Sequence, residues 1–492
     1  MPKPYFLLSA NINACPHQFT ISLEGITKMS HPRANDEKRE KALLNLSHSR
    51  MWNKIIFIVC FIVVSALIAD AYLARTAELY TPNLSRNPGT MTVFILICLV
   101  CSVGQFMILY FVRDRSKEIH TTAKERFYKT YKVAMTVQIT LSIVLFFVIF
   151  QLLVTSYYFI FTLIVATATS YGLALTTMVL LVKSFFSWFV PSKNFVILAY
   201  AISAAILVIH LGFTTFSTIS ALLDVPSEIR TPISRTPFFL PGTLESALNT
   251  VRSLTSIISF SVLWVATVLL LHHYSQKVGK IKYWILVSLP LVYFLSQFPT
   301  LFFNLFNPLI REDPIFFGSL LTFLFTLSKP AGGILFGIAF WTVARKLPSA
   351  TVITNYLLIS AIGFVLLFAS DQAIVLIGLP YPPFGLAAVS FVGLSSYLIF
   401  VGIYYSAISL SYNERVRFEI KKFALSESKL LDSIGSAQLE KIIAEKAEII
   451  AQNQDTAAKG SGIPLSIQDD DIRKYIDDVM REMKSYKKEE KE

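Results

Sequence analysis

The most constraining feature of this chain is a succession of long apolar runs between residues 53 and 412, separated by short polar stretches. A spanning helix needs about 20 mostly apolar residues, because it must cross about 30 Å of hydrocarbon at about 1.5 Å per residue. Ten runs meet this requirement, so the sequence predicts an all-α, polytopic transmembrane helix bundle of about ten spans. The spans are expected at 53–74, 91–112, 133–155, 158–182, 195–217, 251–273, 284–305, 316–343, 351–370 and 384–412.

The composition excludes an ordinary soluble protein. Of the 492 residues, 54% are hydrophobic and only 15% are charged, which is too little charge to cover the surface of a soluble chain of this size. The net charge of +12 could suggest a nucleic-acid partner, but the Lys and Arg residues gather in alternate loops and not in one patch. The expected partner of this chain is therefore the lipid bilayer, and no nucleic acid is expected.

The distribution of Lys and Arg also predicts an orientation. Segments on one side of the ten spans hold 24 of these residues near the span ends, and segments on the other side hold 6. Loops rich in Lys and Arg stay on the cytoplasmic side. We therefore expect a multi-pass protein of the cell membrane with both its N-terminus and its C-terminus in the cytoplasm.

Composition divides the chain into three parts. Residues 1–52 are expected to be a largely disordered cytoplasmic segment, with Met29 as an alternative start because a polar, basic stretch begins there. Residues 53–412 are expected to form the bundle, and residues 413–492 to form a cytoplasmic amphipathic helical tail. Within the bundle, residues 184–189 are expected to lie along the inner surface as an interfacial turn.

Lys329 is the leading candidate for a functional residue, because it lies near the middle of the eighth expected span. A cation at that depth costs at least about 2.5 kcal/mol unless it is paired or solvated. Pro330 follows it, removes a backbone donor and clashes with the preceding turn, so a helix break is expected there. Irregular backbone inside a membrane needs surrounding protein or a water-filled cavity, so Lys329 is expected to face inward.

Polar residues of other spans are expected at the same depth, about 20 Å along the helix from the start of each span. With Lys329 and Pro330 they make up a candidate intramembrane polar site, and they are Gln105, Tyr171, His210 and Gln297. No Asp or Glu is expected in this layer, because Asp70 and Asp371 fall near the outer ends of their spans. The alternative is that Lys329 snorkels or donates to backbone carbonyls near Pro330 without forming a site.

Two short patterns concern helix packing and metals. Gly333 and Gly337 form a small-xxx-small pattern that lets a second helix approach closely. Internal packing of the bundle is the expected role of this pattern, and a dimer contact is the alternative. Cys98 and Cys101 are three residues apart and could share a soft metal, but no further Cys or His is expected at their depth, so no metal site is predicted.

The sequence lacks the short motifs of several enzyme classes. No phosphate-binding GxxxxGK[ST] loop, HExxH metal motif, GxSxG elbow or kinase signature is present. We therefore expect no enzymatic activity and no cofactor.

The tail contains two stretches with helical periodicity. Leu439, Ile442, Ile443 and Ile450 recur at helical spacing and predict a first amphipathic helix. A second helix is expected from Asp469 onward, with an apolar stripe that is a candidate partner-binding surface. This stripe consists of Ile472, Tyr475, Ile476, Val479, Met480 and Met483. Its partner could be the first tail helix, a second copy of the tail or a cytoplasmic protein, so the oligomeric state stays open.

One segment of the tail, Glu427 to Ile443 with the sequence ESKLLDSIGSAQLEKII, resembles a segment of multi-spanning membrane proteins of ammonia-oxidising archaea whose activity is uncharacterised. The resemblance covers the tail well and the membrane part only in its general layout. It implies a lineage and no chemistry.

Two functions stay open on these observations. The leading interpretation is a non-enzymatic membrane sensor or scaffold that couples to a cytoplasmic partner through the C-terminal helices. The alternative is a transporter or channel with a central polar site around Lys329. The expected lack of a carboxylate at depth weighs against an ion-coupled carrier, because proton and sodium carriers usually need one there.

Overall fold

The computed structural model describes only part of the chain, in two compact units, Met1–Ile55 and Ile56–Glu492. The described residues are 32–76, 88–118, 121–229, 244–272, 279–298, 307–308, 311–345, 351–372, 374–378, 380–412, 431, 433–445 and 449. All contacts given below lie within the second unit. Residues 32–52, expected to be largely disordered, belong to helix α1, which runs from Pro32 to Thr76.

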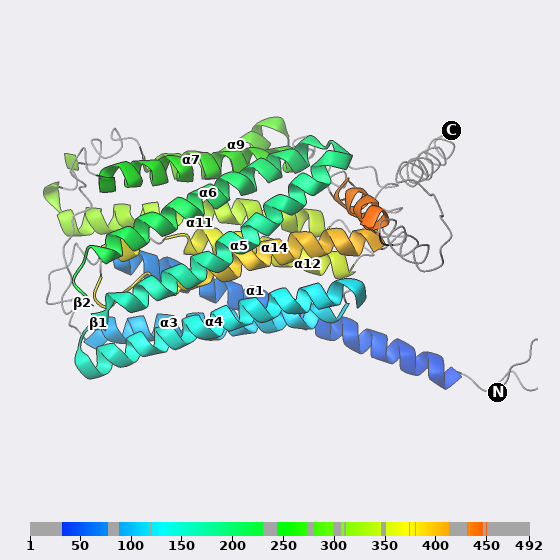
Figure 1. Ribbon diagram of the computed structural model, residues 1–492, viewed down its shortest axis with the longest axis horizontal. Coiled ribbons are helices and arrows are strands. Elements are labelled where there is room, and N and C mark those ends of the chain that lie inside the picture. Colours follow the sequence, from blue (N-terminus) through cyan, green and yellow to red (C-terminus); the bar gives the residue numbers. More distant parts are fainter. Residues whose placement is uncertain are drawn as a thin grey trace, which may run out of the picture. The chain divides into compact units, whose positions relative to one another are not determined.

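The described chain is almost entirely helical (Figure 1). Its helices are α1 (Pro32–Thr76), α3 (Pro88–Arg115), α4 (Thr121–Thr155), α5 (Ile160–Ser192), α6 (Phe195–Leu223), α7 (Leu244–Leu271), α9 (Lys280–Leu295), α11 (Pro314–Arg345), α12 (Thr351–Ser370), α13 (Ile374–Ile377) and α14 (Leu386–Tyr412). A short 3₁₀ helix, η1 (Ser116–Glu118), follows α3, and two short strands, β1 (Tyr158–Phe159) and β2 (Glu228–Ile229), lie beside α5 and α6.

Nine helices within the described ranges are long and apolar enough to cross a membrane. They correspond to nine of the ten expected spans, which confirms an all-α polytopic bundle. The tenth expected span, 284–305, is represented by the 16-residue helix α9 and by residues outside the described part of the chain.

Helix α14 lies inside the bundle, and nearly all of its side chains are buried. A helix that is apolar on all faces is stable only when other helices surround it. It packs most extensively on α12 and α5. Close approach to α12 depends on Gly402, because a Cβ there would lie 2.5 Å from the Tyr356 carbonyl oxygen and 2.5 Å from the Ser360 backbone nitrogen.

Helix α11 approaches α12 through the two glycines of the small-xxx-small pattern. A Cβ at Gly333 would lie 2.8 Å from the Phe368 Cβ, and a Cβ at Gly337 would lie 2.8 Å from the Ala361 carbonyl oxygen. Both glycines therefore face another helix of the same chain, where small residues allow the two backbones to come close.

Strands β1 and β2 join two connections at one end of the bundle. They pair antiparallel, with Tyr158 opposite Ile229. The Tyr158 hydroxyl donates to the Pro380 carbonyl at 3.0 Å, which attaches the segment before α14 to the same place. This end, where α5 begins and α6 ends, is called the β1–β2 end below.

The expected interfacial turn at residues 184–189 is wrong, because α5 continues without interruption to Ser192. Within this stretch Trp188 is almost fully buried, and its Nε1 donates to the Gln438 Oε1 at 2.8 Å. An indole N–H usually finds a partner when it is buried, and here the C-terminal tail supplies it.

A helical segment of the tail, residues 433–445, packs on the bundle (orange in Figure 1). The Asn194 Nδ2 donates to the Ser433 Oγ at 2.9 Å. Ile434 and Ala437 are buried, whereas Leu439 is only partly buried. The residues that contact the bundle therefore lie before the apolar positions expected for the first tail helix, which begin at Leu439. The expected partner-binding residues from Ile472 to Met483 lie outside the described residues.

Candidate functional site

The candidate site lies at a break in one of the apolar spans. The span Val352–Ile377 contains two helices, α12 and α13, and between them Asp371 and Gln372 are not helical. The backbone turns there through short hydrogen bonds, including one from the Gln372 nitrogen to the Ser370 carbonyl at 2.7 Å. Non-helical backbone at membrane depth requires surrounding protein or a water-filled cavity.

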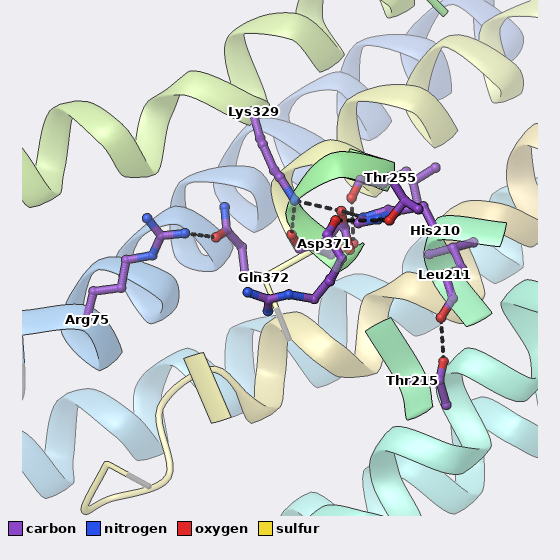
Figure 2. A network of polar contacts seen from close by, with 11 residues as sticks. Arg75, His210, Leu211, Thr215, Thr255, Lys329, Asp371 and Gln372 are labelled. Carbon is purple, nitrogen blue, oxygen red and sulfur yellow. Dashed lines mark hydrogen bonds and ion pairs between the residues drawn. The ribbon is translucent and has the colours of Figure 1, made fainter. Parts of the chain in front are cut away.

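Asp371 forms the centre of a buried network at this break (Figure 2). Its Oδ2 accepts from the Lys329 Nζ at 2.8 Å and lies 3.2 Å from the His210 Nε2. The Lys329 ammonium also donates to the Asp371 backbone carbonyl at 3.1 Å. The carboxylate is 7% exposed, so this ion pair interacts through little solvent.

The position of Lys329 indicates the depth of the network. It lies about 22 Å along α11 from the start of that helix, near the middle of the span. His210 is likewise near the middle of α6. The expectation that no acidic residue shares this layer is therefore wrong, because Asp371, which directly follows α12, contacts both Lys329 and His210.

His210 connects the carboxylate to helix α7. Its Nδ1 lies 3.2 Å from the Thr255 Oγ1, and the Thr255 hydroxyl can also donate to the Arg252 carbonyl at 2.9 Å. Because Nε2 faces a carboxylate, it must carry a proton in order to form a hydrogen bond. Two proton arrangements fit: either Thr255 donates to Nδ1 of a neutral imidazole, or an imidazolium Nδ1 donates to Thr255.

Two arginines add positive charge at the break. Arg252, on α7, is 8% exposed, interacts electrostatically with Asp371 and donates through Nη2 to the Asn249 Oδ1. Arg75, near the end of α1, donates through Nη2 to the Gln372 Oε1 at 2.6 Å. Gln372 is adjacent to Asp371 and is itself buried, so Arg75 reaches the same break (Figure 2).

Buried hydroxyls on α5 and α6 lie in line with the network. His210, Thr214 and Thr218 are four residues apart on α6 and so share one face of that helix. The hydroxyls of Thr214 and Thr218, and those of Thr167 and Tyr171 on α5, are buried and have no hydrogen-bond partner of normal geometry among the described residues. The Tyr171 hydroxyl is close enough to interact electrostatically with Asp371.

The structure brings together only part of the expected polar site. Lys329 and His210 contact Asp371, and Tyr171 lies beside it. Gln105 instead donates to Ser142 across α3 and α4, and the Gln297 Nε2 donates to the Phe294 carbonyl at 3.0 Å within its own turn. Within the described residues, these two glutamines do not hydrogen-bond to Lys329, His210 or Asp371.

The expected helix break at Pro330 is also wrong, because α11 continues through it from Pro314 to Arg345. The break lies between α12 and α13 instead. The residues that sequence reasoning missed are Asp371, Arg252, Arg75, Gln372 and Thr255. The signal for Asp371 was the apolar run 374–377 directly after it, which indicates a charge inside a span and not at its end.

Asp70, a second buried carboxylate, has a structural contact. Its Oδ2 accepts from the Ala388 backbone nitrogen at 2.9 Å, in the first turn of α14, where backbone N–H groups lack helical partners. It lies near Cys98 and Cys101. No group of three or more His, Cys, Asp or Glu residues suited to a metal occurs in the part of the chain that the structure describes.

These features define a multi-pass helical membrane protein with a charged network at a discontinuous span. Comparison with known proteins found no matching family model, no match among curated proteins and no match among solved structures.

Proposed function

We propose that this chain is a non-enzymatic membrane transporter whose solute binds at the break after α12. The observation that carries the proposal is Asp371, which lies at that break in contact with both Lys329 and His210. Discontinuous helices in transporters place free backbone groups and charges at a central binding site. Ionisable residues inside spans are costly, and for that reason they generally mark solute or ion pathways.

The ion pair in the network can exchange its partners at modest cost in free energy. A buried ion pair gains little net stability, because loss of hydration offsets much of the Coulomb attraction. A competing solute can therefore replace one partner at modest cost. Lys329 comes from α11, His210 from α6 and Asp371 from the break, so exchange of these contacts would change how three helices are held together.

The hydroxyls on α5 and α6 supply a route to this site. From His210 to Thr218 the route rises about 12 Å along α6 toward the β1–β2 end. A buried hydroxyl without a protein partner requires a water or a solute group to satisfy it. With the bias of Lys and Arg toward the opposite side, the β1–β2 end faces the exterior, and both chain termini are cytoplasmic in the cell membrane.

A matched pair of variants tests the route. Thr214→Val combined with Thr218→Val is expected to reduce solute flux about tenfold, because two polar contacts of roughly 0.7 kcal/mol each are removed from the pathway. Thr215→Val is the control, since the Thr215 hydroxyl already donates to the Leu211 carbonyl at 2.7 Å (Figure 2). Equal flux for both variants in proteoliposomes would contradict the route.

Contacts of the tail favour a second candidate, a sensor or scaffold that couples the bundle to a cytoplasmic partner. Trp188 and Asn194 bind residues 438 and 433 of the tail, so a change in α5 can reach the tail directly. In this alternative the bundle detects a signal and the residues beyond 449 engage the partner.

A pair of changes distinguishes the two candidates. Lys329→Met is expected to abolish flux, whereas deletion of residues 450–492 is expected to leave flux unchanged, because it keeps the packed segment 433–445. Flux is measured by light scattering of proteoliposomes that are mixed with glycerol, alanine, potassium acetate or potassium phosphate, with valinomycin present to prevent charge build-up. If the unchanged protein lets no solute enter faster than protein-free vesicles do, the sensor is favoured.

A further inference from the structure

We propose that the site binds a small oxyanion between the guanidinium groups of Arg75 and Arg252. This inference depends on the proposed site at the break after α12 and adds the chemical class of its ligand. It concerns the two arginines, whose guanidinium groups hydrogen-bond only to neutral amides among the described residues.

The charges around the break do not balance. Among the described residues, the network holds the cations Lys329, Arg75 and Arg252 and the single carboxylate of Asp371. That carboxylate is already paired with the Lys329 ammonium at 2.8 Å. The excess is therefore two positive charges in a region that little solvent reaches, and a buried charge is stable only when it is paired.

Within the part of the chain that the structure describes, neither arginine donates a hydrogen bond to a charged group. Arg75 donates to the amide oxygen of Gln372, and Arg252 donates to the amide oxygen of Asn249. Neutral amides fix the orientation of a guanidinium group without neutralising it. Each of these bonds uses Nη2, which leaves other N–H donors of the guanidinium group for a ligand.

The two guanidinium groups reach adjacent residues at the break. Arg75 contacts Gln372 while Arg252 interacts with the adjacent Asp371, and the two positive charges repel each other. An anion between them would convert this repulsion into two attractions, and Coulomb energies are large where solvent is scarce. The Tyr171 hydroxyl lies beside the same network, next to Asp371.

The chemistry of these donors selects an oxyanion over a halide. The planar guanidinium group presents parallel N–H donors that match two oxygens of a carboxylate or a phosphate. Two such groups from different helices, α1 and α7, can hold two or more oxygens of one small ion. A halide is a single acceptor atom, so it cannot place one acceptor in front of each of the parallel N–H donors.

Binding to the purified full-length protein in dodecyl maltoside tests the proposal without any need for transport. Sodium phosphate and sodium acetate are titrated at constant ionic strength against sodium chloride, and the thermal unfolding midpoint is followed. A ligand that binds only the folded protein raises this midpoint with concentration. We expect a saturable rise with phosphate, acetate or both, and none with chloride.

Three variants locate the site. Arg252→Gln and Arg75→Gln are each expected to weaken oxyanion binding at least about tenfold, since a charge-assisted bidentate contact is lost. Arg252→Lys keeps the charge and loses the fork, so an intermediate loss is expected. Arg311→Gln, which changes an exposed arginine outside the network, is the control and should bind like the unchanged protein.

A second arm separates a free ion from a lipid headgroup that carries the same chemistry. Phosphatidylglycerol is added to the detergent in place of the salts, and a rise that depends on Arg252 with this lipid alone identifies the headgroup phosphate as the source. The proposal is overturned if no oxyanion acts differently from chloride, or if Arg252→Gln and Arg75→Gln bind unchanged. Flux of an uncharged solute without oxyanion binding would overturn the ligand class and leave the proposed transport intact.

Discussion

Asp371→Asn is expected to lower the free energy of unfolding by about 3 kcal/mol and to abolish flux. Removing one partner of a buried ion pair leaves the other charge uncompensated, which costs about 3–5 kcal/mol. The lower end applies here because the Lys329 side chain is 19% exposed and is therefore not fully buried. Thermal or denaturant unfolding of the purified protein in detergent measures the change in stability, and proteoliposomes measure the flux.

A double-variant cycle shows whether the loss belongs to the pair. Asp371→Asn combined with Lys329→Met should regain much of the lost stability, because no unpaired charge remains, yet it should regain no flux. The matched control is Arg126→Gln, which breaks an exposed ion pair with Glu445 at 3.4 Å and should cost at most about 1 kcal/mol. Additive losses in the cycle would show that Lys329 and Asp371 do not act together.

Gly402→Ala is the second change with a large expected effect. A Cβ at this position would overlap the backbone of α12 at Tyr356 and Ser360, and backbone atoms cannot move aside as the end of a flexible side chain can. Overpacking usually costs about 1–3 kcal/mol, and a clash with the backbone of the central helix pair belongs at the upper end or beyond. We expect a markedly lower unfolding midpoint and a lower yield of folded protein.

Gly172→Ala is the control for this change. Gly172 also lies within a helix, but a Cβ there meets nothing within 4 Å. Alanine has a higher helix propensity than glycine, so this variant should be neutral or more stable by up to about 1 kcal/mol. If Gly402→Ala behaved like Gly172→Ala, α12 and α14 would not be as close as described.

The spans could be predicted from the sequence because each is a local property of about 20 consecutive residues. The depth of Asp371 could not be predicted, because hydrophobicity does not show how deep in the bundle the end of a helix lies relative to its neighbours. Residues 351–370 were correctly expected to be helical, but that helix begins at one side of the bundle and ends beside the middle of α11. Only the packing of α12 on its neighbours reveals the depth.

The two arginines illustrate a second limit. Arg75 and Arg252 were counted among the six cations on the side poor in Lys and Arg, as if they belonged to loops. Both lie within helices, and both reach the break after α12. Arginines on the side that is poor in Lys and Arg were thus a signal of the site. Such a charge is costly to move across the membrane, so its presence there indicates a function.

The burial of α14 has a consequence for how the protein is made. It is the last of the nine described spans in sequence, yet it occupies the interior, and its first turn is held by Asp70 of the first span. During synthesis, the inner faces of the earlier helices lack their packing partner until α14 leaves the ribosome. The bundle can therefore close only when translation is nearly finished, and a chain stopped before residue 386 would present those faces to lipid and to quality-control proteases.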